Sequence, residues 1–139
     1  MFVLDTNVLS ELRKANAGKA DPGVVGWAAG VPVGALFLSA ISILELEMGI
    51  LLIERRDAMQ GGMLRGWFNE HVLPAFSGRI LPVDCAVALQ CARFHVPDPR
   101  AERDALIAAT ALVHGMTVVT RNVADFAPTG VAIINPWTQ

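Results

Sequence analysis

The chain has 139 residues, of which 53% are hydrophobic and 17% charged, and its formal net charge is −2. This composition excludes an intrinsically disordered chain, and two cysteines are too few for a disulfide scaffold. The slightly acidic balance also excludes a nucleic-acid-binding protein that works through a broad basic surface. The length predicts a single domain that spans residues 1–139.

Strands and helices alternate in the predicted elements. We expect five short apolar strands, at residues 2–4, 36–38, 79–83, 117–120 and 131–134. Helices are expected between them, at residues 7–14, 22–30, 42–54, 57–75, 84–95 and 105–114. Pro82 predicts either that the third strand ends there or that it lies at an edge of the sheet. This alternation indicates an α/β three-layer sandwich with a central, mostly parallel sheet of four to five strands.

One stretch without charged residues, Pro22 to Leu44, is long enough to cross a bilayer. We expect no membrane span there, because Gly30, Pro32 and Gly34 place a turn in its middle. A secretory signal is not expected either, because Asp5 interrupts the apolar start. The predicted location is therefore the cytoplasm. A mean hydropathy of +0.46 predicts in addition an apolar surface that a partner covers.

Four acidic residues map to one edge of the predicted sheet. Asp5 directly follows the first strand, and Asp125 follows the fourth. Glu45 lies in the first turn of the helix after the second strand, and Asp104 starts the helix before the fourth. Ligands of open α/β sheets bind beyond the carboxyl ends of the strands. We therefore expect these four carboxylates to share one site.

Each of these acids also has an ordinary structural role. Asp5 can support a turn and cap a helix, and Asn7 or Thr6 can also cap the first helix. Ser42 and Glu45 match an S-x-x-E capping box, and Asp104 and Asp125 can cap a helix or a turn. Capping does not require convergence, however. Two carboxylates about 5 Å apart repel each other by about 3 kcal/mol at an effective dielectric of about 20, so a shared site needs protonation or a cation.

The chemistry of this acidic site follows from its donor atoms. An all-oxygen set suits Mg²⁺ or Mn²⁺, whereas Zn²⁺ would need the Cys and His cluster that the chain lacks. Such an ion activates water for hydrolysis of a phosphodiester. Asn7 can hold Asp5 or a water or cap a helix, and Thr120 can place its hydroxyl beside the acids. Arg103 and Arg121 flank the acids, and contact with phosphate, contact with an acid and simple solvation all stay open.

Four segments of the chain resemble the PIN domain and, more narrowly, the VapC/FitB-type toxins of bacterial toxin–antitoxin pairs. They are Val3–Leu9, Ser42–Gly49, Asp104–Ala111 and Thr120–Phe126. The resemblance implies a Mg²⁺- or Mn²⁺-dependent ribonuclease that a cognate antitoxin holds inactive. It also implies a homodimer, and a toxin–antitoxin complex that binds operator DNA through the antitoxin.

The resemblance also implies roles for individual residues. The acidic quartet of the family is matched by Asp5, Glu45, Asp104 and Asp125, and its supporting hydroxyl by Thr120. The loop Val96–Arg103 is unusually charged, so that Asp98 or Glu102 is an alternative to Asp104.

The leading hypothesis is cleavage of single-stranded RNA that leaves 5′-phosphate and 3′-hydroxyl ends. Asp5 and Asp104 would hold the principal metal, and Glu45 and Asp125 would complete its shell. One alternative is a phosphatase of the haloacid-dehalogenase type, which requires a second Asp where this chain has Asn7. Another is a non-catalytic interaction module.

For association, we expect a homodimer. Its surface is predicted on two helices, at residues 43–53 and 86–94. The reason is the excess of hydrophobic residues, which a monomer would leave exposed.

Overall fold

The computed structural model of the protein describes residues 1–138. In this part of the chain, five parallel strands form a sheet in the order β3-β2-β1-β4-β5. The strands are β1 (Phe2–Leu4), β2 (Leu36–Ser39), β3 (Ile80–Leu81), β4 (Thr117–Val119) and β5 (Ile133–Ile134). All five were expected, and β3 lies at an edge, which is one of the two placements that Pro82 predicts. Gln139, the last residue of the predicted domain, lies outside the described residues.

Helices separate the strands along the chain. They are α1 (Thr6–Arg13), α2 (Pro22–Ala29), α3 (Ala40–Arg56), α4 (Ala58–Trp67), α5 (Leu73–Ala75), α6 (Cys85–Phe94), α7 (Glu102–Val113) and α8 (Val123–Phe126). A π-helical turn, η3 (Phe68–Val72), joins α4 to α5. Short 3₁₀ turns are η1 (Ala15–Ala17), η2 (Val33–Ala35) and η4 (Ala127–Thr129). The predicted helix at residues 57–75 is thus one continuous helical segment with a change of winding.

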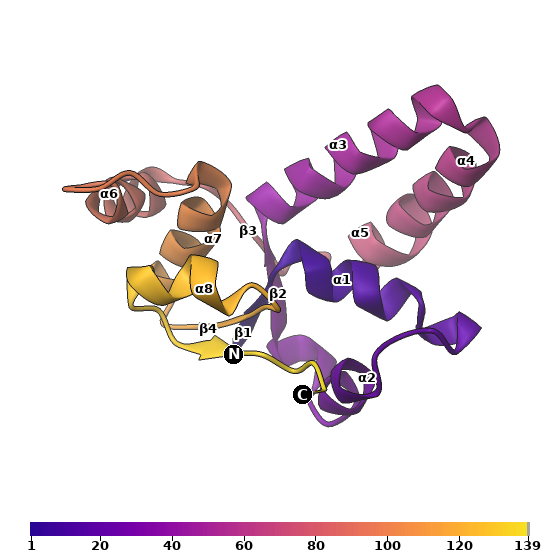
Figure 1. Ribbon diagram of the computed structural model, residues 1–139, viewed down its shortest axis with the longest axis horizontal. Coiled ribbons are helices and arrows are strands. Elements are labelled where there is room, and N and C mark those ends of the chain that lie inside the picture. The colour runs from indigo at the N-terminus through magenta and orange to yellow at the C-terminus, as the bar shows by residue number, and fades with distance from the viewer. Residues whose placement is uncertain (139) are drawn as a thin grey trace.

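The sheet is covered on both faces, which confirms the three-layer architecture. In Figure 1, α1 to α5 lie on one side of the strands and α6 to α8 on the other. Leu4 and Leu38 pack with Val8 of α1 in one buried cluster, whereas Val3 packs with Ile107 of α7 in another. Successive strand residues point to opposite faces, so a strand buried on both sides reads as an unbroken apolar run.

The uncharged stretch between Pro22 and Leu44 is divided among several elements. It contains α2, η2, β2 and the first residues of α3, with the turn η2 near its middle. Within residues 1–138, no helix combines the length and the apolar character that crossing a membrane requires.

Of the caps that the sequence offered for the first helix, Asn7 and Thr6 are wrong and Asp5 is correct. Asp5, rather than Asn7 or Thr6, caps α1, and its Oδ1 accepts a hydrogen bond from the Thr6 N–H at 2.8 Å. The reason is that α1 follows β1 without a loop, so the residue after the strand already stands at the N-cap.

Two other predicted helix starts, those of the helices at residues 42–54 and 105–114, are also wrong. Helix α3 begins at Ala40 and is capped by the Ser39 hydroxyl, three residues before Ser42, so Ser42 and Glu45 do not form a capping box. The Ser42 hydroxyl is instead buried without a hydrogen-bond partner in the described part of the chain. Helix α7 begins at Glu102, which places Asp104 in its first turn rather than at the cap. Acidic side chains are stabilised throughout a first turn by the helix dipole, so the sequence signal does not distinguish these positions.

Candidate active site

The site begins where β1 and β4 end side by side. Leu4 pairs with Val119, so the next residues, Asp5 and Thr120, are neighbours at the carboxyl edge of the sheet. The Asp5 backbone N–H donates to the Val119 carbonyl at 2.9 Å. The Thr120 hydroxyl donates to Asp5 Oδ2 at 2.7 Å, and both side chains are buried. Strand register therefore brings together two residues that are 115 positions apart.

Both oxygens of the Asp5 carboxylate are held by donors. Oδ1 accepts from the Thr6 N–H, and Oδ2 accepts from the Thr120 hydroxyl and from the Asn7 amide, the latter at 3.3 Å. Hydrogen bonds to an ionised carboxylate offset much of the free energy that its burial costs. They also fix the direction in which Asp5 faces the pocket.

Glu45 reaches the same region from α3. The Thr6 hydroxyl donates to Glu45 Oε1 at 2.8 Å, which ties the start of α1 to the second turn of α3. On its other side, Glu45 Oε2 lies 3.8 Å from Arg103 Nε at the start of α7. Glu45 is thus oriented by one hydroxyl and one cation, each from a different helix.

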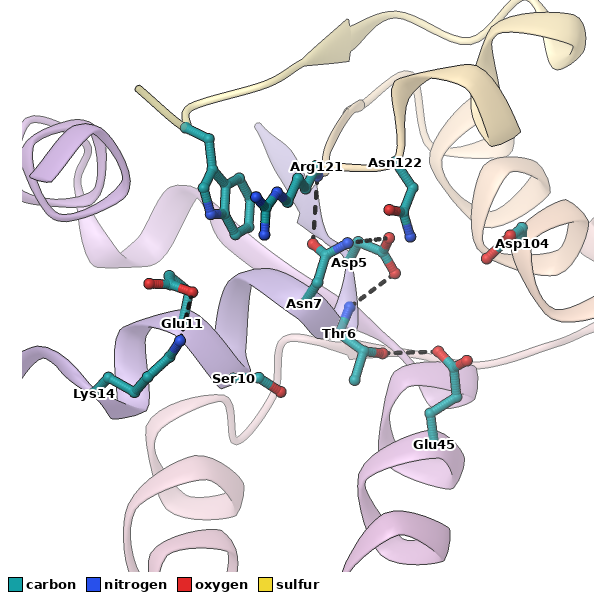
Figure 2. Close-up of a pocket in the computed structure, with 11 residues that line it drawn as sticks. Asp5, Thr6, Asn7, Ser10, Glu11, Lys14, Glu45, Asp104, Arg121 and Asn122 are labelled. Carbon is teal, nitrogen blue, oxygen red and sulfur yellow. Dashed lines mark hydrogen bonds and ion pairs between the residues drawn. The ribbon is translucent and has the colours of Figure 1, made fainter. Parts of the chain in front are cut away.

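These elements enclose a pocket of about 410 Å³ at the end of the sheet. Three of the four predicted acids, Asp5, Glu45 and Asp104, line it, and Figure 2 shows Asp5 between Asp104 and the start of α1. Asp125 is exposed on α8, and its charge acts on Asp5 and Asp104. Three of the predicted acids therefore line one pocket, and the fourth, Asp125, is near enough for its charge to act on two of them.

Burial and, to a smaller extent, mutual repulsion raise the pKa values of two of these acids. The pKa of Asp104 is raised from 3.8 to about 6, first by burial and then by the charges of Asp5, Asp125 and Glu45. The pKa of Asp5 is also raised, mainly by burial, although hydrogen bonds from Thr120 and Thr6 act against this. Strongly shifted pKa values of neighbouring groups in a pocket are typical of functional sites.

The acids do not form a closed metal cage. Within residues 1–138, no three His, Cys, Asp or Glu side chains lie close enough to surround an ion by themselves. The tight meeting of carboxylates that the sequence suggested is therefore an open arrangement around the pocket. An open set of carboxylate oxygens still fits Mg²⁺ or Mn²⁺, because such ions keep several water ligands and take only one or two carboxylates.

The alternatives to Asp104 lie elsewhere. Asp98 is exposed in the loop before α7. Glu102 lines a neighbouring hollow together with Glu45, Arg103 and Asp104. Asp104 alone of these three acids lines the pocket that contains Asp5.

Several pocket residues were missed by the sequence analysis. Thr6, Ser10 and Lys14 are spaced by four residues, so α1 presents them on one face toward the pocket. This spacing was a usable signal. Asn122 and Trp137 also line the pocket, but they come from a loop and from the end of the chain, where no periodic pattern marks them.

The comparisons with known proteins agree with this geometry. The family model described as PIN domain matches residues 2–128. The chain is 38% identical to the VapC ribonuclease Y4jK of Sinorhizobium fredii, over 99% of this chain and 98% of that protein. It is 36% identical to the toxin FitB of Neisseria gonorrhoeae, over 99% of both chains. The structure of FitAB bound to an IR36 DNA fragment contains a chain that superposes with a TM-score of 0.89 at 35% identity, covering 100% of this chain and 97% of that one.

Proposed function

The chain belongs to the PIN domain family and, within it, to the VapC and FitB type of toxin, and from this premise we propose that it is a metal-dependent endoribonuclease and the toxin of a toxin–antitoxin pair. The observation that carries the proposal is the pocket in which Asp5, Glu45 and Asp104 meet at the end of the sheet. Capping and packing do not explain why acidic side chains from the N-cap of α1, the second turn of α3 and the first turn of α7 line one pocket.

The oxygen donors of the pocket support Mg²⁺ or Mn²⁺ as the proposed metal. Asp5 and Asp104 would be the principal ligands, and Glu45 and Asp125 would complete the shell directly or through water. Burial raises the pKa of Asp104 to about 6 together with the charges of its acidic neighbours, so a divalent cation would relieve repulsion that the metal-free site carries. A bound Mg²⁺ or Mn²⁺ supplies activated water and stabilises charge on the phosphate oxygens.

The protein's own residues orient this site. Thr120 and Asn7 hold Asp5 Oδ2, while Thr6 connects two carboxylates, because its backbone N–H donates to Asp5 Oδ1 and its hydroxyl donates to Glu45 Oε1. These contacts keep the acids in place when the substrate arrives, so that little reorganisation accompanies the reaction. The scissile phosphate would approach from the open side of the pocket.

The phosphatase alternative is disfavoured by the same contacts. Such an enzyme uses the first Asp as a nucleophile, yet both Asp5 oxygens accept hydrogen bonds. Asn7 donates an amide to Asp5 instead of supplying an acid. A purely binding module is disfavoured because it has no need to keep costly, mutually repelling carboxylates in a pocket.

The proposed partners follow from the relatives. A FitAB complex bound to DNA favours a cognate antitoxin as the inhibitor of this chain and as the route by which it reaches operator DNA. A cytoplasmic location follows from an RNA substrate and from such a partner.

We also propose a homodimer that uses the outer faces of α3 and α6. Leu44, Met48 and Leu52 are exposed along α3, and Leu89 is exposed on α6. A stripe of this kind is typical of an interface. Light scattering at micromolar concentration is expected to give the mass of a dimer, and a monomer mass would contradict this proposal.

The test of the activity is cleavage of single-stranded RNA with Mg²⁺ or Mn²⁺ and with chelator. We expect metal-dependent cleavage that leaves 5′-phosphate and 3′-hydroxyl ends. Asp5→Asn should abolish cleavage while the protein stays folded, because Asn is an equally good helix cap. Asp98→Asn removes the same charge from an exposed loop and is the matched control, which should keep full activity. Cleavage in chelator, cyclic phosphate products, or an active Asp5→Asn variant would each overturn the proposal.

A further inference from the structure

The acidic pocket contains two cations, and they differ in their partners. Lys14 lies 3.0 Å from Glu11, so its charge is already neutralised. Arg121 makes no ion pair with any carboxylate of residues 1–138, although it lines the same pocket. Arg103, the other candidate from the sequence, does not line the pocket, and it forms an ion pair with Glu45. Arg121 is therefore the cation at this site whose charge is available to a ligand.

Both the backbone and the guanidinium of Arg121 are held by neighbouring residues. Its backbone follows Thr120, and its N–H faces Asn7 Oδ1 at 3.4 Å, which links it to the residues around Asp5. Its guanidinium carbon lies 5.6 Å from the centre of the Trp137 ring, within the range of a cation–π contact. Figure 2 shows Arg121 on the side of Asp5 opposite Asp104.

Trp137 is in turn held by the end of the chain. The backbone N–H of Thr138 donates to Asp21 Oδ2 at 3.0 Å, and the same oxygen caps α2 by accepting from the Gly23 N–H. A Cβ at Gly23 would lie 2.5 Å from the Pro136 carbonyl, so the chain end rests directly on the start of α2. Trp137 itself is buried at 9% exposure. The Trp137 ring that contacts Arg121 is thus held in place by the surrounding packed residues.

We infer that Arg121 binds a backbone phosphate of the substrate next to the scissile bond, and that Trp137 positions its guanidinium for this contact. The inference rests on the proposed ribonuclease function. An RNA backbone is repelled by the carboxylates of the pocket, so binding requires a fixed positive charge beside them. A planar guanidinium held on an aromatic face presents its free N–H groups to phosphate oxygens with little loss of side-chain freedom.

The experiment measures binding separately from cleavage. The Asp5→Asn variant is mixed in chelator with a fluorescent single-stranded RNA, and the dissociation constant is followed by anisotropy over a range of salt concentrations. Adding Arg121→Gln should weaken binding about tenfold, as expected for one charged hydrogen-bonded contact. The slope of log K against log salt should shrink by about 0.7, the value for one phosphate contact on a single strand. Arg93→Gln, which removes an exposed charge on α6, is the matched control and should change neither quantity.

The role of Trp137 is tested in the same background. Trp137→Leu keeps apolar bulk in the core but removes the aromatic face, so it should weaken RNA binding when Arg121 is present. It should have no further effect on binding when combined with Arg121→Gln, because a positioning residue acts only through the residue it positions. Additive losses would overturn the role of Trp137.

The outcomes separate this inference from the proposed function. If Arg121→Gln leaves the dissociation constant and the salt slope as they are, the phosphate contact is refuted, while metal-dependent cleavage by the unmodified chain would still support the function. If Asp5→Asn binds no single-stranded RNA in chelator, the phosphate contact is overturned, and the proposed function is overturned as well only if the unmodified chain fails to cleave RNA with Mg²⁺ or Mn²⁺.

Discussion

Asp104 offers a direct test of the electrostatics of the site. We predict that Asp104→Asn makes the metal-free protein more stable at pH 7.5 while it removes the ribonuclease activity. A rise of the pKa from 3.8 to about 6 corresponds to about 3 kcal/mol of lost stability once the group is ionised. Because Asp104 is only partly buried, solvent screens part of this, and we expect a gain of about 1–2 kcal/mol.

The pH dependence of this gain has a definite sign. A carboxyl whose pKa is raised on folding binds its proton more tightly in the folded state, so its cost is absent below pH 3.8 and complete above about pH 6. Asp104→Asn should therefore match the unmodified protein near pH 4 and exceed it at pH 7.5. Other titrating groups are common to both proteins, so their contributions largely cancel in the difference.

The assay is urea unfolding at the two pH values, followed by circular dichroism, in chelator and then in Mg²⁺. Mg²⁺ should stabilise the unmodified protein more than the variant, because a ligand that binds only the folded state adds to its stability. A variant that is equally destabilised at both pH values would refute the reasoning, since it would show that Asp104 contributes ordinary packing or capping instead of charge repulsion.

Two further predictions concern contacts around the site. Thr6→Val removes the hydroxyl that donates to Glu45. The Mg²⁺ concentration for half-maximal cleavage should therefore rise about 10- to 100-fold, with little change in the melting temperature. An unchanged Mg²⁺ requirement would show that other groups orient Glu45. Gly23→Ala places a Cβ 2.5 Å from the Pro136 carbonyl, so it should lower the free energy of unfolding by about 1–3 kcal/mol in urea titrations. The control is Gly26→Ala, whose Cβ meets open space and which should not lower the free energy of unfolding.

The order of the strands and helices was predictable because each depends on neighbours in the sequence. Unbroken apolar runs such as Phe2–Leu4 indicated buried parallel strands, and the structure confirms them. The starts of α3 and α7 were not predictable to the residue. Ser39 and Ser42 are both good caps, and only the absence of a loop after β2 decides between them.

The prediction that four acids share one site depended on a general property of parallel sheets. Knowing that strand ends lie at one edge was enough to bring Asp5 near Asp104. It was not enough to give their distances, and the pocket is more open than the expected cluster. Side-chain spacing is set by how deeply each helix packs on the sheet, which no local pattern encodes.

By itself, the sequence determined the layered α/β architecture and the identity of the acidic residues, because apolar periodicity and strand ends are properties of short segments. Only the tertiary structure decided which polar groups face those acids. Thr6 meets Glu45 across two helices, and Arg121 rests on Trp137 at the end of the chain. Such contacts arise when distant segments pack around a common core, so they appear only after the whole chain has folded.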